Sequence, residues 1–154
     1  MQQKFLTKRV EGSKFIDLVC NQAILQPAVE LRQQLVSELK EAKILDEFFS
    51  KTKVHHYLIQ NCEGFFKIMI KQQAILDEDL DMIWSNVSLN EDTRVEFYKV
   101  ISGVSVEGAD QLKFFIDRII GDNSFGVKSS EIDLFVSISR KMMQADARDN
   151  LVTP

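Results

Sequence analysis

Two cysteines and two adjacent histidines are the strongest candidates in this sequence for nucleophilic chemistry. Cys20, Cys62, His55 and His56 could supply the thiolate and the imidazole base that a thiol protease needs, together with a polar group that orients the histidine. Both cysteines, however, occupy apolar helical stripes, where a buried and unreactive thiol is the common case. His56 precedes Cys62 by six residues, which puts the two side chains on different sides of one helix. The sequence therefore predicts no catalytic residue.

Metal-binding patterns are also incomplete. The adjacent histidines would diverge by about 100° on a helix, so they are poor joint ligands for one ion. The acidic residues Asp77, Asp79 and Asp81 alternate like the start of a calcium loop, but Met82 and Ser88 stand where that loop needs Gly and Glu. We expect no metal site and no cofactor.

The glycine-containing segment from Gly121 to Gly126 could be compared with a phosphate-binding loop. It lacks the Lys-Ser/Thr of that loop and carries no dinucleotide fingerprint. We interpret it as a surface loop within the one substantial irregular segment, residues 121–130.

The elements that would carry these residues are helices, because apolar residues recur at spacings of three and four along the chain. Only 6 Gly and 2 Pro interrupt it, too few for the frequent turns of a β-sandwich. Gly12 is a possible break in the first helix. The expected helices cover residues 4–24, 28–43, 44–49, 54–73, 77–87 (capped by Asp77), 90–103, from 105 or 107 to 120, and from 129 or 130 to about 145.

This pattern predicts an all-α fold, an armadillo/HEAT-like α-solenoid segment of about seven or eight helices. Residues 1–154 would form a single helical-repeat domain with a frayed tail over 145–154. The last helix carries the apolar residues Ile132, Phe135, Val136, Met142 and Met143. The residues expected in the core are Phe65, Met69, Ile83, Phe115, Ile116 and Ile119.

Charge is uneven along the chain. Residues 1–74 hold 11 Lys and Arg against 8 Asp and Glu, whereas residues 75–154 hold 8 against 15. The net charge of −4 argues against a nucleic-acid binder. The acidic helix openings are a candidate protein-interaction patch. It consists of Asp77, Glu78, Asp79, Asp81, Glu91, Asp92 and Glu96.

Apolar stretches are too short to span a bilayer, and we expect no secretory signal, because no apolar block with a small-residue cleavage site follows Lys4, Lys8 and Arg9. Two isolated cysteines do not form a disulfide framework, which fits a reducing compartment. We therefore expect protein partners, no membrane and a cytoplasmic location.

Two phrases resemble a known family. The residues 76–84, Leu-Asp-Glu-Asp-Leu-Asp-Met-Ile-Trp, follow a helix opened by His56-Tyr57-Leu58. This order resembles the helical-repeat region of the very large ubiquitin-specific proteases of the fat-facets type. Lys8-Arg9-Val10-Glu11-Gly12 and residues 106–120 resemble further parts of that region. After Trp84 the sequence departs from the family, which commonly has Lys-His-Glu where Asn90-Glu91-Asp92 stands here.

The resemblance implies that the chain is a fragment of a larger protein. It would be a non-catalytic, protein-binding scaffold of a deubiquitinase. The parent would hydrolyse ubiquitin–protein isopeptide bonds by a cysteine mechanism outside this chain, because no Cys-box or His-box phrase occurs here. An armadillo-like adaptor unrelated to ubiquitin hydrolysis is the alternative. The third hypothesis is a self-contained helical hydrolase that uses Cys62 and His56.

Overall fold

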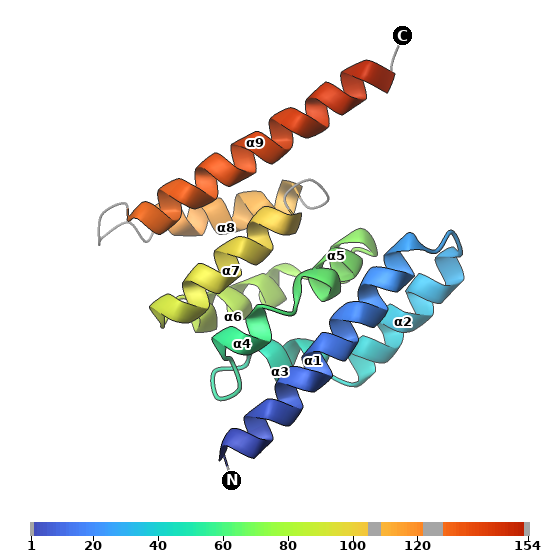
Figure 1. Ribbon diagram of the computed structural model, residues 1–154, viewed down its shortest axis with the longest axis vertical. Helices are drawn as coiled ribbons and strands as arrows, with labels where there is room; N and C mark the ends of the chain where they lie inside the picture. Colours follow the sequence, from blue (N-terminus) through green and yellow to red (C-terminus); the bar gives the residue numbers. More distant parts are fainter. Residues whose placement is uncertain (1, 105–108, 122–127, 153–154) are drawn as a thin grey trace.

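The computed structural model describes residues 2–104, 109–121 and 128–152, and over these residues it is all-α. Nine helices and no strand occur in the described ranges (Figure 1). Their bounds are α1 Gln2–Leu25, α2 Val29–Glu41, α3 Ile44–Phe49, α4 His56–Ile59, α5 Glu63–Lys71, α6 Asp77–Val87, α7 Glu91–Val104, α8 Ala109–Gly121 and α9 Ser129–Val152.

The helices are arranged in two rows that contact one another. One row runs from α1 through α5 and α7 to α9, and the other runs from α2 through α3 and α6 to α8. The short α4 contacts α1 and α7, whereas α2 also contacts α1 and α5. The most extensive contact joins α1 to α5, which follows it along the chain only after three intervening helices. Figure 1 shows α1 and α2 at one end of the molecule and α9 at the other.

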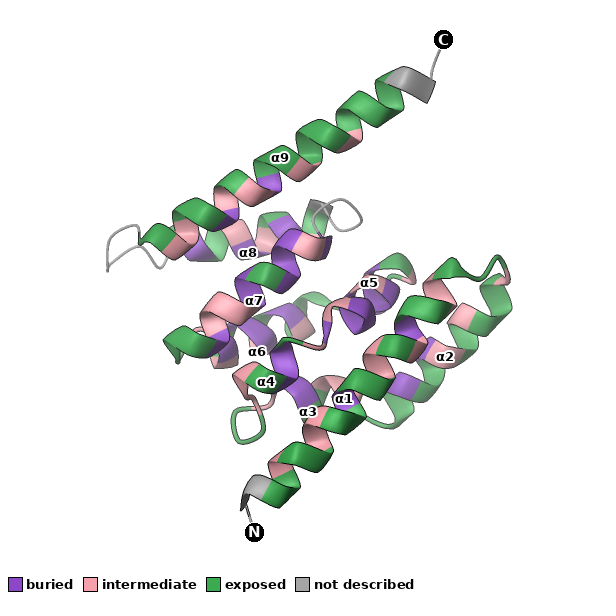
Figure 2. Cartoon of the chain, viewed as in Figure 1, coloured by how far each residue is buried: buried purple, intermediate pink, exposed green. Residues whose placement is uncertain are grey.

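A chain of aromatic rings fills the interior between the two rows. Phe49 packs edge-on against Phe66 and Phe97, and Phe97 meets Phe115 with ring centroids 5.0 Å apart. These side chains come from α3, α5, α7 and α8, so one aromatic cluster links four helices. Such edge-to-face pairs add to the free energy that burial of the rings already provides. All four rings are buried, and Figure 2 shows the buried residues gathered in the middle of the molecule.

The expected core residues are found where the sequence placed them, with one exception. Phe65, Met69, Ile83, Phe115 and Ile119 are buried, whereas Ile116 is only half-buried. The single helix expected over residues 54–73 is wrong, because residues 60–62 form a turn between α4 and α5. Leu58 before the turn, Cys62 in it and Phe65 after it are all buried, so the apolar spacing persists although the helix does not.

Three details of the helices also differ from what the sequence predicts. Gly12 does not break α1, and a side chain there would meet open space. α9 continues to Val152, so residues 145–152 are helical instead of frayed, since they contain no Gly or Pro. Asp77 is the first residue of α6, and Leu76 occupies the cap position. The expected helix start at 105 or 107 and the loop 122–127 lie outside the described residues.

Candidate functional site

Both thiols are buried and protonated. Cys20 on α1 and Cys62 at the start of α5 are each fully inaccessible. Burial raises the pKa of Cys20 to about 12, with the charge of Asp17 adding to the effect. Burial also raises the pKa of Cys62 well above its usual value, and its Sγ donates to the Ile59 carbonyl at 3.0 Å. A nucleophilic cysteine must be reachable as a thiolate, and neither residue meets that condition.

The two histidines take part in local structure. His55 has an extended backbone just before α4, and its Nδ1 accepts a hydrogen bond from the Tyr57 amide at 3.2 Å. The His55 and His56 rings stack with centroids 4.4 Å apart. Burial, followed by the charges of His56 and Arg9, lowers the pKa of His55, which suits an uncharged acceptor. Over the described residues, no three His, Cys, Asp or Glu side chains gather as metal ligands would.

The first four residues of the predicted acidic patch lie at the start of α6. Asp79 accepts a hydrogen bond from the Leu76 amide at 2.9 Å and so caps the helix. Asp81 forms an ion pair with Arg118 of α8 at 2.6 Å. Asp77 and Glu78 are exposed. Acidic side chains in the first turn are stabilised by the helix dipole, so local structure accounts for part of this group.

The other three residues lie on α7. Glu91 approaches Lys128 to 3.9 Å, Glu96 pairs with Lys99 at 3.0 Å, and Asp92 is exposed. The predicted patch is thus divided between the starts of two consecutive helices, α6 and α7. We refer to these two groups as the acidic edges.

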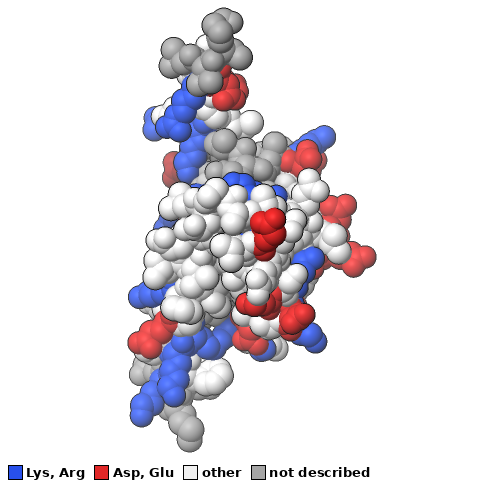
Figure 3. Space-filling model, turned by 90° about the vertical axis from the view of Figure 1, so that its right-hand side faces the viewer, with Lys and Arg blue, Asp and Glu red and all other residues white. Residues whose placement is uncertain are grey.

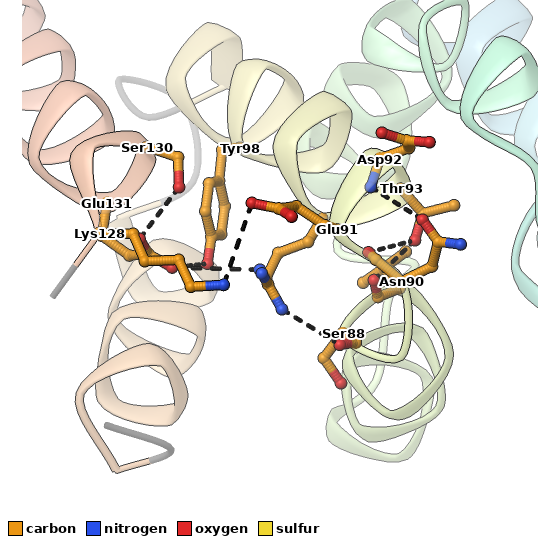
Figure 4. A network of polar contacts seen from close by, with 11 residues as sticks. Ser88, Asn90, Glu91, Asp92, Thr93, Tyr98, Lys128, Ser130 and Glu131 are labelled. Atoms are coloured by element: carbon orange, nitrogen blue, oxygen red, sulfur yellow. Dashed lines mark hydrogen bonds and ion pairs between the residues drawn. The ribbon is translucent and has the colours of Figure 1, made fainter. Parts of the chain in front are cut away.

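A polar network that sequence reasoning missed joins α7 to the start of α9. Glu131 accepts hydrogen bonds from the Tyr98 and Ser130 hydroxyls, both at 3.0 Å, and lies 4.0 Å from the Arg94 guanidinium (Figure 4). Burial alone would raise the pKa of Glu131. The hydrogen bonds from Ser130 and Tyr98 and the charge of Arg94 outweigh burial and lower it. Glu131 is 33 residues from Tyr98, so the network cannot be predicted from the spacing of neighbouring residues in the sequence.

The end helices carry apolar side chains on the surface. On α1, Phe15, Leu18 and Leu25 are exposed, whereas Ser13 and Cys20 are buried. No charged residue occurs from position 18 to position 29. The side of the molecule that holds the α1–α2 turn shows a broad surface with few charged side chains (Figure 3). α9 has a similar exposed face, described below.

A shallow hollow lies between the α2–α3 turn and the start of α6. Phe65, Met69 and Ala74 are among its apolar lining residues, and Lys40 and Asp46 bring opposite charges to it. It can accept an apolar side chain with polar neighbours, which is what a protein surface commonly offers to a partner.

None of the described helices combines the length and the apolar character needed to cross a bilayer. Comparison of the chain with protein-family models, with curated proteins and with solved structures gives no match.

Proposed function

We propose that this chain is a non-catalytic protein-interaction scaffold with an armadillo/HEAT-like solenoid arrangement. The observation that carries the proposal is that both end helices, α1 and α9, have apolar side chains on an exposed face as well as on a buried one. α1 and α9 each bury some apolar side chains against the body and expose others. The repeats of a solenoid contact only their neighbours, so the outer face of an end repeat is open to a further element or a partner.

The buried thiols support the non-catalytic part of the proposal. A cysteine hydrolase needs a reachable thiolate beside a base, but both thiols have raised pKa values. The partners are proteins. The exposed residues Asp77, Glu78 and Asp92 are the parts of the acidic edges available to them.

The proposed parent is a fat-facets-type deubiquitinase in the cytoplasm. The support is the resemblance of residues 76–84, in which Leu80, Ile83 and Trp84 pack into the core and Asp79 caps α6. These roles concern folding, so an unrelated armadillo-like adaptor could use the same residues, and it is the second candidate. Sequencing of full-length transcripts separates the two. A downstream ubiquitin-hydrolase domain supports the first, and a stop codon after Pro154 removes it.

The experiment that tests the scaffold proposal is incubation of the protein with a ubiquitin-based probe that captures catalytic thiols. Intact mass should show no adduct, because Cys20 and Cys62 are inaccessible. An adduct on Cys62 that disappears in His56→Ala would overturn the proposal in favour of a hydrolase. Thermal denaturation of both proteins shows whether the variant is folded.

A further inference from the structure

The exposed face of α9 carries a regular apolar stripe. Ile132, Val136 and Met143 are 52%, 45% and 70% exposed, and Ser139 lies between them. Their positions, at offsets of 0, 4, 7 and 11, form one face of the helix. Leu134 and Ile138, by contrast, are buried against the body. Figure 2 shows the exposed side of α9 running along the end of the molecule.

The offsets of this stripe are those of the a and d positions of a heptad repeat, the pattern by which two helices pack side by side. Two kinds of residue flank the stripe. Asp133 and Arg140 lie along one edge, seven residues apart, and both are exposed. Among the described residues neither has an ion-pair partner. Phe135, which is half-buried against the body, and Met142, which is exposed, lie along the other edge with the same spacing.

We propose that a second copy of this chain packs antiparallel against the exposed face of α9. In this register Ile132 of one copy lies beside Met143 of the other, and Val136 lies beside Ser139. The same register brings Asp133 opposite Arg140, and Phe135 opposite Met142. Each contact occurs twice, because the two-fold axis passes between residues 137 and 138.

Charge complementarity identifies the occupant as a second copy. A two-fold interface requires that the surface be complementary to itself when it is reversed. One antiparallel register makes the stripe and both of its edges complementary to a second copy. In this register the pair of Asp133 and Arg140 occurs twice. α7 packs against α9 (Figure 1), and the α9 side chains buried against the body are Leu134 and Ile138, which do not belong to the stripe.

This interface goes beyond the proposed scaffold function and does not depend on it. The stripe offers only four residues from each copy, so we expect a weak dimer with a dissociation constant of about 10 to 100 μM. A scaffold that binds other proteins would remain a scaffold if the dimer did not form. The ubiquitin probe therefore tests the scaffold proposal alone, and sedimentation equilibrium tests the dimer alone.

Sedimentation equilibrium over a concentration series tests the dimer. The mass should rise from 17.7 kDa towards twice that value, and Val136→Asp should weaken association by about tenfold or more. Phe15→Asp is the matched control, since it places the same charge on an exposed site of α1 at the other end and should leave association unchanged. Circular dichroism tests whether both variants are folded. A monomer at all concentrations, or equal loss in both variants, would overturn the proposal.

A charge exchange tests the antiparallel register. Asp133→Arg and Arg140→Asp each place like charges opposite one another, so each variant alone should associate more weakly than the natural chain. An equimolar mixture should form a mixed dimer, because one variant then carries positive charge at both positions and the other carries negative charge at both. A mixture that associates no better than its components rules out this register.

Discussion

The two end helices are held to the body by carboxylates in opposite electrostatic situations. On α1, Asp17 accepts a hydrogen bond from the Gly64 amide at 2.8 Å. It thereby supplies a cap to α5, whose own cap residue Cys62 makes no side-chain cap hydrogen bond. On α9, Glu131 accepts from two hydroxyls, of which Tyr98 belongs to α7. Both carboxylates lie on end helices: Asp17 accepts a backbone hydrogen bond from α5, and Glu131 accepts a side-chain hydrogen bond from α7.

Their pKa values shift in opposite directions. Burial raises the pKa of Asp17, and the charge of Glu63 raises it further. The hydrogen bond from the Gly64 amide lowers this pKa but does not outweigh burial. At Glu131 burial is outweighed by hydrogen bonds from Ser130 and Tyr98 and by Arg94, so the pKa is lowered. Asp17 also accepts a hydrogen bond from Asn21, so each carboxylate has two hydrogen-bond donors. The balance of burial against donors and neighbouring charges therefore sets the direction of each pKa shift.

The largest expected effect tests whether the two ends depend on a common body. Phe115→Ala removes a ring that contacts Phe97, Trp84 and Phe114, and it should lower the free energy of unfolding by about 3–5 kcal/mol. Phe15→Ala makes the same change at a side chain that is 65% exposed, and it should cost less than about 0.5 kcal/mol. Urea denaturation measures both. Similar losses would mean that the α1 end belongs to the same packed core.

The next effect tests the cap supplied by α1. Asp17→Ala leaves the buried Gly64 amide without its acceptor, and it should cost about 1–2 kcal/mol. Asp17→Asn retains an acceptor oxygen and removes the buried charge, so it should cost clearly less. Amide exchange at Gly64 locates the change. Equal losses in the two variants would show that the charge, and not the hydrogen bond, stabilises the α1 end.

A smaller effect tests the attachment of α9. Tyr98→Phe removes a hydroxyl donor to Glu131 and should cost about 0.5–1.5 kcal/mol. The pKa of Glu131 should rise in this variant, because a group that favours its charged form is lost. Carboxyl titration by NMR measures that shift, with Asp17 as an internal control that should not move. An unchanged Glu131 titration would remove Tyr98 from the network.

The smallest effect is the opposite response of the two ends to pH. The lowered pKa of Glu131 stabilises the fold above the unfolded-state pKa, and this contribution is lost as the pH falls through the folded value. The raised pKa of Asp17 destabilises the fold while the group is ionised, and acidification relieves that penalty. From about pH 5 down to about pH 3, a range that begins above the usual carboxyl pKa values and extends below them, protection against hydrogen exchange should fall in α9 relative to α1. Asp17→Asn and Glu131→Gln should each abolish the response of one end.

The sequence predicted the helices and most of the core because both depend on local apolar spacing. It could not determine which of two stripes on a two-sided helix is buried. The apolar spacing of the last helix predicts Ile132, Phe135, Val136, Met142 and Met143 as its apolar residues. All of these except the half-buried Phe135 are exposed, whereas Leu134 and Ile138 pack inward. Only the position of the neighbouring helices decides between such faces, and that information is not local.

The candidate site was less predictable for the same reason. The acidic residues were correctly located at helix starts, and the structure divides them between the starts of α6 and α7. Asp17 and Gly64, which share a hydrogen bond, are 47 residues apart in the sequence. The spacing of nearby residues therefore does not predict this contact. Asp79 caps α6 in place of the expected Asp77, because Leu76 occupies the cap position and its amide is the donor.

The position of the single tryptophan determines what optical methods detect. Trp84 is buried on α6, with its ring centroid 6.5 Å from that of Phe115 on α8. Its emission therefore reports the environment of the aromatic cluster and is insensitive to separation of α1 or α9 from the body. Far-ultraviolet dichroism, by contrast, records every helix. A difference between the two transitions would be the optical signature of an end that unfolds before the middle.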